Sequence, residues 1–421
     1  MTSPQIWRTL LPLFVAAFLA FSYNNIFMSI TPLYALSCSL SAFEAGTQTT
    51  IFLAVAIALR FVFGALADRI GTKPVMICGM LSFVIGAFVF VGSSSFASII
   101  AARCIQAIGL ASFWSCATTT VCNVSPIDKN GWYLGLYRFI TSASLLLGPV
   151  LAFKLIELIS YQICFVVLGT SAFLALIALV AMPAVSASGH TSSDNSHNVS
   201  PDASSNIPPD TSHNIPSDTL YNVSSSWRAR LKPFLSNKTL WFIVVCTLCA
   251  AMSYGLVFSF AGTYLNACEE TLNTGIYFTI LGAGGLVGNP LAGWLSDRMN
   301  IRLSISLWLG CIGFGVLSLA YAPNNFFVLL TSGTLVGLGY AGNITASQSL
   351  TSSCMHIAHR ATAFAIQQNA IDLGIALASS LFGLAFSMAG TASSLPFVIQ
   401  GTIVMLAGIC ALTLQVRYTR R

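Results

Sequence analysis

Long apolar segments alternate with short polar ones along almost the whole chain. A helix needs about 20 predominantly apolar residues to span the hydrocarbon core of a membrane, and lipid offers its backbone no hydrogen-bond partner. Twelve segments reach that length, and each is predicted to be a helix: 10–36, 45–66, 75–94, 96–122, 132–155, 161–183, 239–265, 273–296, 303–322, 326–350, 361–388 and 395–416. The pattern therefore predicts an all-α membrane protein with twelve transmembrane helices.

Composition supports the same interpretation. Of the 421 residues, 56% are hydrophobic and only 7% are charged, whereas soluble domains carry about 25% charged residues. A chain with so few charges cannot cover its own surface with polar groups, so we expect it to lie in membrane lipid.

The basic residues gather on one side of the predicted helices. Fourteen of the 18 Lys and Arg residues lie in the termini and in every second loop, and the other loops have none: Arg8, Arg69, Lys73, Lys129, Arg228, Arg230, Lys232, Lys238, Arg298, Arg302, Arg360, Arg417, Arg420 and Arg421. The positive-inside rule then puts both termini in the cytoplasm. Topology explains the net charge of +6, so nucleic-acid binding is not expected.

A polar stretch at residues 184–236 divides six predicted helices from six. It contains an octapeptide repeat, "NVSPDASS", "NIPPDTSH", "NIPSDTLY" and "NVSSS", with units that start at Asn198, Asn206, Asn214 and Asn222. The repeat has no apolar face to bury and is predicted to be disordered. We expect a cytoplasmic linker between an N-terminal six-helix bundle, residues 1–183, and a C-terminal one, residues 237–421. The alternative is a regulatory segment.

The two halves resemble each other in sequence. An offset of 229 maps Gly64, Asp68 and Arg69 onto Gly293, Asp297 and Arg298, and an offset of 230 maps Ser29, Tyr34 and Cys38 onto Ser259, Tyr264 and Cys268. Matches at corresponding helix pairs indicate an internal repeat, which is typical of secondary transporters with a substrate site between the halves.

Three motifs carry a resemblance to a known family. "GALADRIGTK", Gly64 to Lys73, is close to the G-x-L-a-D-R-x-G-x-K signature of the major facilitator superfamily, and "GWLSDRMNIR", from Gly293, is a degraded copy of it. "RCIQAIG", from Arg103, and "SLLLGPVLAF", which contains Gly148-Pro149, are similar to motifs of the drug:proton antiporter branch and its efflux relatives. The resemblance implies the major facilitator fold.

It also implies a set of residues that control the conformation. In the family, the Asp that matches Asp68 caps the N-terminus of a helix from the other half, and basic residues hold it there. The expected gating residues are Gly64, Asp68, Arg69, Gly71, Lys73, Gly148, Pro149, Asp297 and Arg298. For both Asp-Arg pairs, the alternative is a positively charged turn that only fixes topology.

Asp372 lies near the middle of a predicted helix, with no basic residue within two turns along the chain. A buried ionisable group is costly in a membrane, and low dielectric favours the neutral form of a carboxyl. Asp372 is therefore expected to take up and release a proton near neutral pH. The alternative is a structural ion pair with Arg103 or Arg138.

Three arginines also lie inside predicted helices. For Arg103, with Gln106 one turn on, the resemblance implies proton transfer or substrate binding, against packing or snorkelling. Arg138 is expected to meet an anionic substrate group or Asp372, and its alternative is snorkelling to the cytoplasmic side. Arg60, two turns before Asp68, is expected to support the Asp68 contact or to snorkel.

Polar side chains on the first and eleventh segments complete the candidate site. Asn24, Asn25 and Gln368 are expected in the substrate cavity, although such side chains serve equally for helix–helix hydrogen bonds. His356 and His359 have no carboxylate or cysteine cluster beside them, so no metal site is expected. The chain has no nucleotide-binding motif and no catalytic triad signature, so neither a cofactor nor enzymatic activity is expected.

Together these features favour a secondary transporter that exports a small organic molecule in exchange for protons by alternating access. The first alternative is proton-coupled import of a metabolite, and the second is a non-transporting membrane sensor or scaffold. The expected partners are the substrate, protons and membrane lipid. We expect a monomer that spans the bacterial cytoplasmic membrane many times.

Overall fold

A computed structural model describes residues 3–40, 42–158, 160–183, 234, 236–268, 274–390 and 392–413. Within these residues it contains twelve long helices: α1 (Ser3–Ser37), α2 (Ala42–Ile70), α3 (Thr72–Val91), α4 (Phe96–Val124), α5 (Asn130–Leu158), α6 (Tyr161–Ala181), α8 (Lys238–Cys268), α9 (Thr274–Arg298), α10 (Ile301–Leu319), α11 (Phe326–Cys354), α12 (Arg360–Ala389) and α13 (Leu395–Thr413). Short 3₁₀ turns lie at Ile127–Lys129, Ala322–Asn324 and Ile357–His359. Each predicted segment overlaps one long helix, so the all-α prediction is confirmed, although α1 begins at Ser3, seven residues before the predicted start.

Eleven helices of the described chain are long and apolar enough to cross a membrane. The end of the last predicted segment, beyond residue 413, and nearly all of the predicted linker lie outside the described residues. Phe234 is described, and its buried ring packs with Leu240, Met355 and Ala363. This apolar side chain lies close enough to α8 to pack on the end of the helix.

Local sequence explains where several helices begin. Ser95 caps α4 in a reciprocal capping box with Ser98, and the side chains of Asn300 and Asn325 accept backbone N–H groups at the starts of α10 and α11. Such side chains satisfy N–H groups that have no partner within the helix. Gly71 joins α2 to α3 with a φ of 91°, a conformation that glycine adopts without steric cost.

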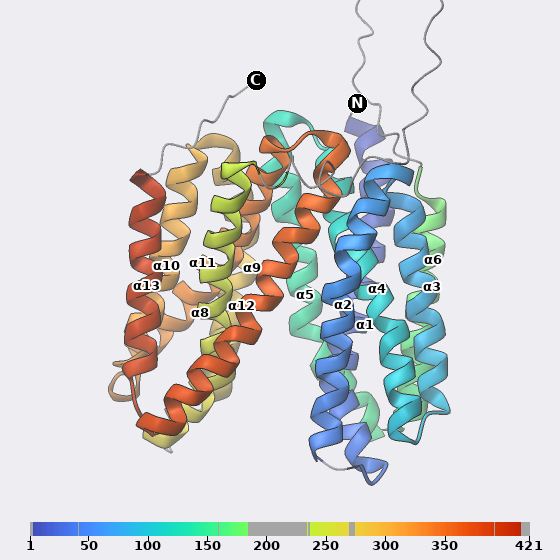
Figure 1. The fold of residues 1–421 in the computed structure, drawn as a ribbon, viewed down its shortest axis with the longest axis horizontal. Coiled ribbons are helices and arrows are strands. Elements are labelled where there is room, and N and C mark those ends of the chain that lie inside the picture. Colours follow the sequence, from blue (N-terminus) through green and yellow to red (C-terminus); the bar gives the residue numbers. More distant parts are fainter. Residues whose placement is uncertain are drawn as a thin grey trace, which may run out of the picture.

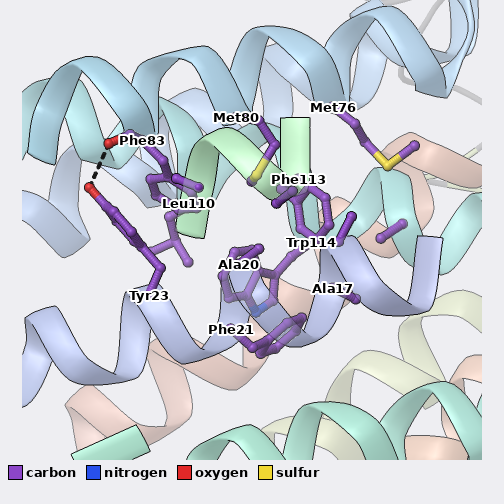
Figure 2. Packing of buried hydrophobic residues seen from close by; sticks show 14 of the residues in the cluster. Ala17, Ala20, Phe21, Tyr23, Met76, Met80, Phe83, Leu110, Phe113 and Trp114 are labelled. Atoms are coloured by element: carbon purple, nitrogen blue, oxygen red, sulfur yellow. Dashed lines mark hydrogen bonds between the residues drawn. The ribbon is translucent and has the colours of Figure 1, made fainter. Parts of the chain in front are cut away.

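The helices form two groups of six, α1–α6 and α8–α13 (Figure 1). Aromatic side chains fill much of the first group: Tyr23 stacks on Phe83 and Trp114 packs against Phe21. The Tyr23 hydroxyl donates to the Phe83 carbonyl at 2.7 Å (Figure 2).

The internal repeat is visible in equivalent hydrogen bonds. The Tyr34 hydroxyl donates to the Ser93 carbonyl, just after α3, at 2.6 Å. Tyr264, its counterpart at the offset of 230, donates to the Ala320 carbonyl, just after α10, at 2.9 Å. The same tyrosine therefore joins the first helix of each half to the end of the third.

The two groups converge at one end and diverge at the other (Figure 1). At the first end, which we call the closed end, α2 and α9 end and α5 and α12 begin; the opposite end is the open end. Across the groups, α2 packs on α12, α5 on α9 and α11, and α4 on α12. Among the described residues, α1 and α8 make no comparably extensive contact.

Candidate functional site

Asp68 joins the two groups at the closed end. Its carboxylate accepts the backbone N–H groups of Ala361 and Thr362 at 2.9 and 3.0 Å and the Thr362 hydroxyl at 2.5 Å. These groups belong to the first turn of α12, where backbone donors lack partners within the helix and the helix dipole is positive. A carboxylate in that position is typically stabilised by about 0.3–2 kcal/mol.

Asp297 makes the equivalent contact on the other side of the molecule. Its two carboxylate oxygens accept the N–H groups of Gly131 and Trp132, in the first turn of α5, at 2.7 and 2.8 Å. Each group of helices therefore supplies one carboxylate to a helix N-terminus of the other.

Glycines allow these helices to approach closely. A Cβ added to Gly64 would lie only 2.9 Å from the Cβ of Ala365 on α12, and one added to Gly135 would lie 2.6 Å from the carbonyl oxygen of Asn289 on α9. Any larger residue at either glycine would separate the helices or displace their backbones.

The same antiparallel contact brings Arg60 to Asp372. Arg60 Nη1 lies 2.5 Å from Asp372 Oδ2 and donates to Asn369 Oδ1 at 2.8 Å. Asn369 in turn donates to the Ile57 carbonyl at 3.2 Å. Arg60 is 1% exposed, whereas Asp372 is 19% exposed.

This pairing corrects both partners that the sequence suggested for Asp372. The carboxylate meets Arg60 and neither Arg103 nor Arg138, and Arg60 does not snorkel. The register of α2 against α12 is the reason: Arg60 lies eight residues before Asp68 and Asn369 eight after Ala361, so two antiparallel helices joined at Asp68 bring them together. The equal spacing of eight residues on the two helices could have predicted this meeting from the sequence, once Asp68 was placed at the start of α12.

The repeat supplies a neutral counterpart to this ion pair. At the offsets of 229 and 230, Arg60 corresponds to Asn289 and Asp372 to Ser142. Asn289 Nδ2 donates to Ser142 Oγ at 2.8 Å, and Asn289 Oδ1 accepts the Thr345 hydroxyl at 3.0 Å. Sequence reasoning identified neither Asn289 nor Ser142. The two inter-group contacts thus match in position and differ in charge.

Arg103 and Gln106 meet inside the first group. The buried Arg103 donates to Gln48 Oε1 at 2.7 Å and to Gln106 Oε1 at 3.0 Å, and its guanidinium lies 4.2 Å from the centre of the Phe52 ring. Gln106 donates to the Tyr23 hydroxyl at 2.8 Å. Within the described chain, no carboxylate pairs with Arg103.

Arg138 reaches across the interface from α5. Its Nε donates to Gln348 Oε1 on α11 at 3.0 Å. Tyr340 lies two turns earlier on α11 and stacks on Tyr254 of α8. Arg138 and Asp372 both lie where helices of the two groups meet, and among the described residues they do not form an ion pair with each other.

The remaining predicted site residues occupy varied positions. Asn24, Asn25 and Gln368 are partly buried, and their side chains make no hydrogen bond with another described residue. Lys73, expected to hold Asp68 in place, instead donates to the Val180 carbonyl at 2.9 Å and to that of Met182, at the end of α6.

Of the other gating candidates, Arg69 is exposed and Arg298 stacks on Trp294, with its guanidinium 4.3 Å from the ring centre. Gly148 and Pro149 lie in α5, but their side-chain surroundings fall outside the described residues.

Comparison with known protein families gives a match along most of the chain. The model described as Major Facilitator Superfamily matches residues 13–324 and 274–421. Solved structures with a similar fold include FucP in the outward conformation, with a TM-score of 0.72 at 15% identity over 97% of this chain and 99% of that one. The human organic anion transporter MFSD10 aligns with a TM-score of 0.73 at 14% identity, over 96% and 99% of the two chains.

Curated relatives match over shorter stretches. MFS-type transporter ppz2 of Metarhizium majus (strain ARSEF 297) is 34% identical over 150 residues, 36% of this chain and 26% of the relative. Multidrug resistance protein MdtM of Escherichia coli (strain K12) is 29% identical over 145 residues, which cover 33% and 34%. The methylenomycin A resistance protein of Bacillus subtilis (strain 168) is 33% identical over 106 residues, which cover 25% and 22%. The chain thus spans about a quarter to a third of the length of these relatives.

Proposed function

The chain belongs to the Major Facilitator Superfamily of membrane transporters, and from this premise we propose that it exports a small organic molecule in exchange for protons by alternating access. Export is supported by the resistance proteins among its relatives. The proposal includes the expected topology, with the closed end in the cytoplasm. Arg69, Arg298 and Arg360 all lie at that end, as the positive-inside rule requires.

The single observation that carries proton coupling is the ion pair between Arg60 and Asp372. When ionised, Asp372 attracts Arg60 across the interface, and this attraction is strong where water is scarce. A proton on Asp372 removes the attraction and leaves at most a neutral hydrogen-bond acceptor. The proton therefore binds the two states of the carrier with different affinities, which is the condition for shifting their populations.

The asymmetry of the two inter-group contacts supports the same role. Among the described residues, an ion pair joins α2 to α12, whereas Asn289 and Ser142 form the neutral counterpart between α9 and α5. In this proposal the proton reaches Asp372, which is more exposed than Arg60, while the pair is still in place. Protonation then weakens one side of the closed end, and the carrier opens there.

In the exchange cycle, protonation of Asp372 separates the two groups at the cytoplasmic end, which is the closed end in this structure. The carrier then releases its proton to the cytoplasm. Substrate binds in that state. The re-formed pair of Arg60 and Asp372 then closes this end again, and the substrate leaves through the open end.

Import of a metabolite together with protons is the second candidate function. Arg138 favours it, because an anion held by its guanidinium would place a negative charge in the interface that also contains Asp372, and a proton on Asp372 would reduce the repulsion between the two. The binding of the substrate would then strengthen the binding of the proton, and the reverse, as co-transport requires.

Reconstitution into proteoliposomes with an imposed pH gradient tests these functions. Lumenal pH is recorded while a panel of small organic anions, cations and neutral molecules is added. Export by exchange predicts that substrate and protons move in opposite directions, and co-transport predicts the same direction. If a compound that binds the purified protein produces no flux under any gradient, transport is refuted and a sensor remains.

A further inference from the structure

Arg138 on α5 and the stacked Tyr340 and Tyr254 on α11 and α8 lie where helices of the two halves meet, since Arg138 donates to Gln348 on the same α11. We infer that they bind the substrate, and that this substrate is a planar aromatic molecule with a carboxylate or a similarly shaped anionic group. The inference rests on the proposed transport function and not on the direction of transport.

The guanidinium of Arg138 provides the anionic specificity. Arg60 has the carboxylate of Asp372, and Arg103 uses Nε, Nη1 and Nη2 on Gln48, Gln106 and Met28. Arg138 by contrast donates only from Nε, to Gln348 Oε1, so its two terminal nitrogens have no acceptor among the described residues. Such a pair of nitrogens matches the two oxygens of a carboxylate.

The aromatic specificity comes from α8 and α11. The rings of Tyr254 and Tyr340 stack at 4.1 Å with an angle of 12° between their planes, and Phe258 continues the stack at 5.8 Å and 18°. Aromatic ligands favour stacked or edge-to-face contact with such rings. Phe258 is 58% exposed and lies one turn nearer the open end than Tyr254, so the aromatic surface continues toward that end.

The tyrosine hydroxyls also lack partners. Those of Tyr23, Tyr34 and Tyr264 donate to backbone carbonyls, but within the described chain neither Tyr254 nor Tyr340 makes a hydrogen bond through its hydroxyl. Both tyrosines are only partly buried, so their hydroxyls are open to a ligand. A polar substituent on the ring of the ligand would supply a partner.

The two halves differ in sequence at these positions of the internal repeat. At the offset of 230, Tyr254, Phe258 and Tyr340 correspond to Asn24, Met28 and Leu110, and Gln368 corresponds to Arg138. The second half therefore supplies the aromatic surface, and the first half supplies a cation together with Asn24. A ligand that contacts both halves meets rings on one side and polar groups on the other, which suits an aromatic anion.

Direct binding to the purified protein tests this inference. The probes are benzoate, 2-naphthoate and 2-anthroate, with 2-naphthylmethylammonium as the aromatic cation and cyclohexanecarboxylate as the non-aromatic anion. Calorimetry on protein in nanodiscs should show that at least one aromatic anion binds, and binds more tightly than both controls. Failure of all three aromatic anions, or tighter binding of the cation, overturns the inference.

Variants assign the contacts. Arg138→Gln should weaken binding of the aromatic anion at least about tenfold, the scale of a lost charged hydrogen bond, and Arg138→Lys should weaken it less. Tyr340→Leu should also weaken it, whereas Phe173→Leu, on the exposed face of α6, should not. Thermal unfolding verifies that each variant is folded, and unchanged affinity in folded Arg138→Gln also overturns the inference. No gradient is present, so binding and proton-driven flux can fail independently.

Discussion

At the scale of single residues, the proposed proton coupling depends on the charge of Asp372. Asp372→Asn keeps the shape of the side chain and removes the charge that attracts Arg60. We expect proton-driven flux in proteoliposomes to fall to the background of empty vesicles, with a normal yield of folded protein. Full gradient-driven flux in this variant would refute the assignment.

The internal repeat of the two halves provides a matched control for that experiment. Ser142→Ala removes the neutral hydrogen bond from Asn289, worth about 0.5–1.5 kcal/mol. It should alter the rate of flux modestly and leave its dependence on the pH gradient intact. If Ser142→Ala and Asp372→Asn abolish coupling equally, the charge of Asp372 is not the cause.

At the scale of helices, the carboxylate of Asp68 stabilises the packing of α2 on α12. Asp68→Asn should slow turnover more than it weakens ligand binding, because in the proposed mechanism this contact shifts the populations of the two states of the carrier and does not touch the ligand. Asp297→Asn should act in the same direction at α5. Turnover in proteoliposomes and affinity by calorimetry separate the two effects, and a purified Asp68→Asn protein with normal turnover would contradict the proposal.

Close packing at Gly64 gives a second test of the same helix pair. Gly64→Ala puts a methyl group 2.9 Å from the Cβ of Ala365, so α2 and α12 must move apart. Hydrogen exchange of the Ala361 and Thr362 amides should become faster, since both donate to Asp68. Gly310→Ala is the control, because nothing lies within 4 Å of its added Cβ. Equal exchange in the two variants would show that the contact is not tight.

The helices themselves were predictable, because the length of an apolar segment and the flanking polar residues fix where a membrane helix begins and ends. The sequence also gives the depth of each buried charge. It does not directly give the direction in which the charge points around its helix, so Arg103 and Arg138 were proposed as partners of Asp372 and Arg60 was not. The stack of Tyr254 and Tyr340 was missed for the same reason, since it depends on how α8 and α11 are rotated against each other.

At the scale of the whole molecule, the connection between the halves can be tested separately from their interface. Deleting Asn198 to Tyr221, which lie outside the described residues, should leave transport nearly unchanged. The composition of the octapeptide repeat predicts a flexible chain, and a shorter flexible chain still spans the gap between two domains. Loss of flux in a variant that still unfolds at the normal temperature would assign the repeat a function.

Alternating access also predicts a movement at the open end, where α1 and α8 end. Cys38 and Cys268 occupy equivalent repeat positions there, and both thiols are free in this structure. A disulfide requires Cα atoms within about 7 Å, a distance that we expect only after the open end has closed and the closed end has opened. Mild oxidant should therefore cross-link the pair faster in Gly64→Ala than in the wild-type protein, and should inhibit transport until a reductant is added. Gel mobility and mass reveal the cross-link, which must be absent in Cys38→Ser. A pair that never links, even while substrate is cycling, would mean that the ends of α1 and α8 do not meet.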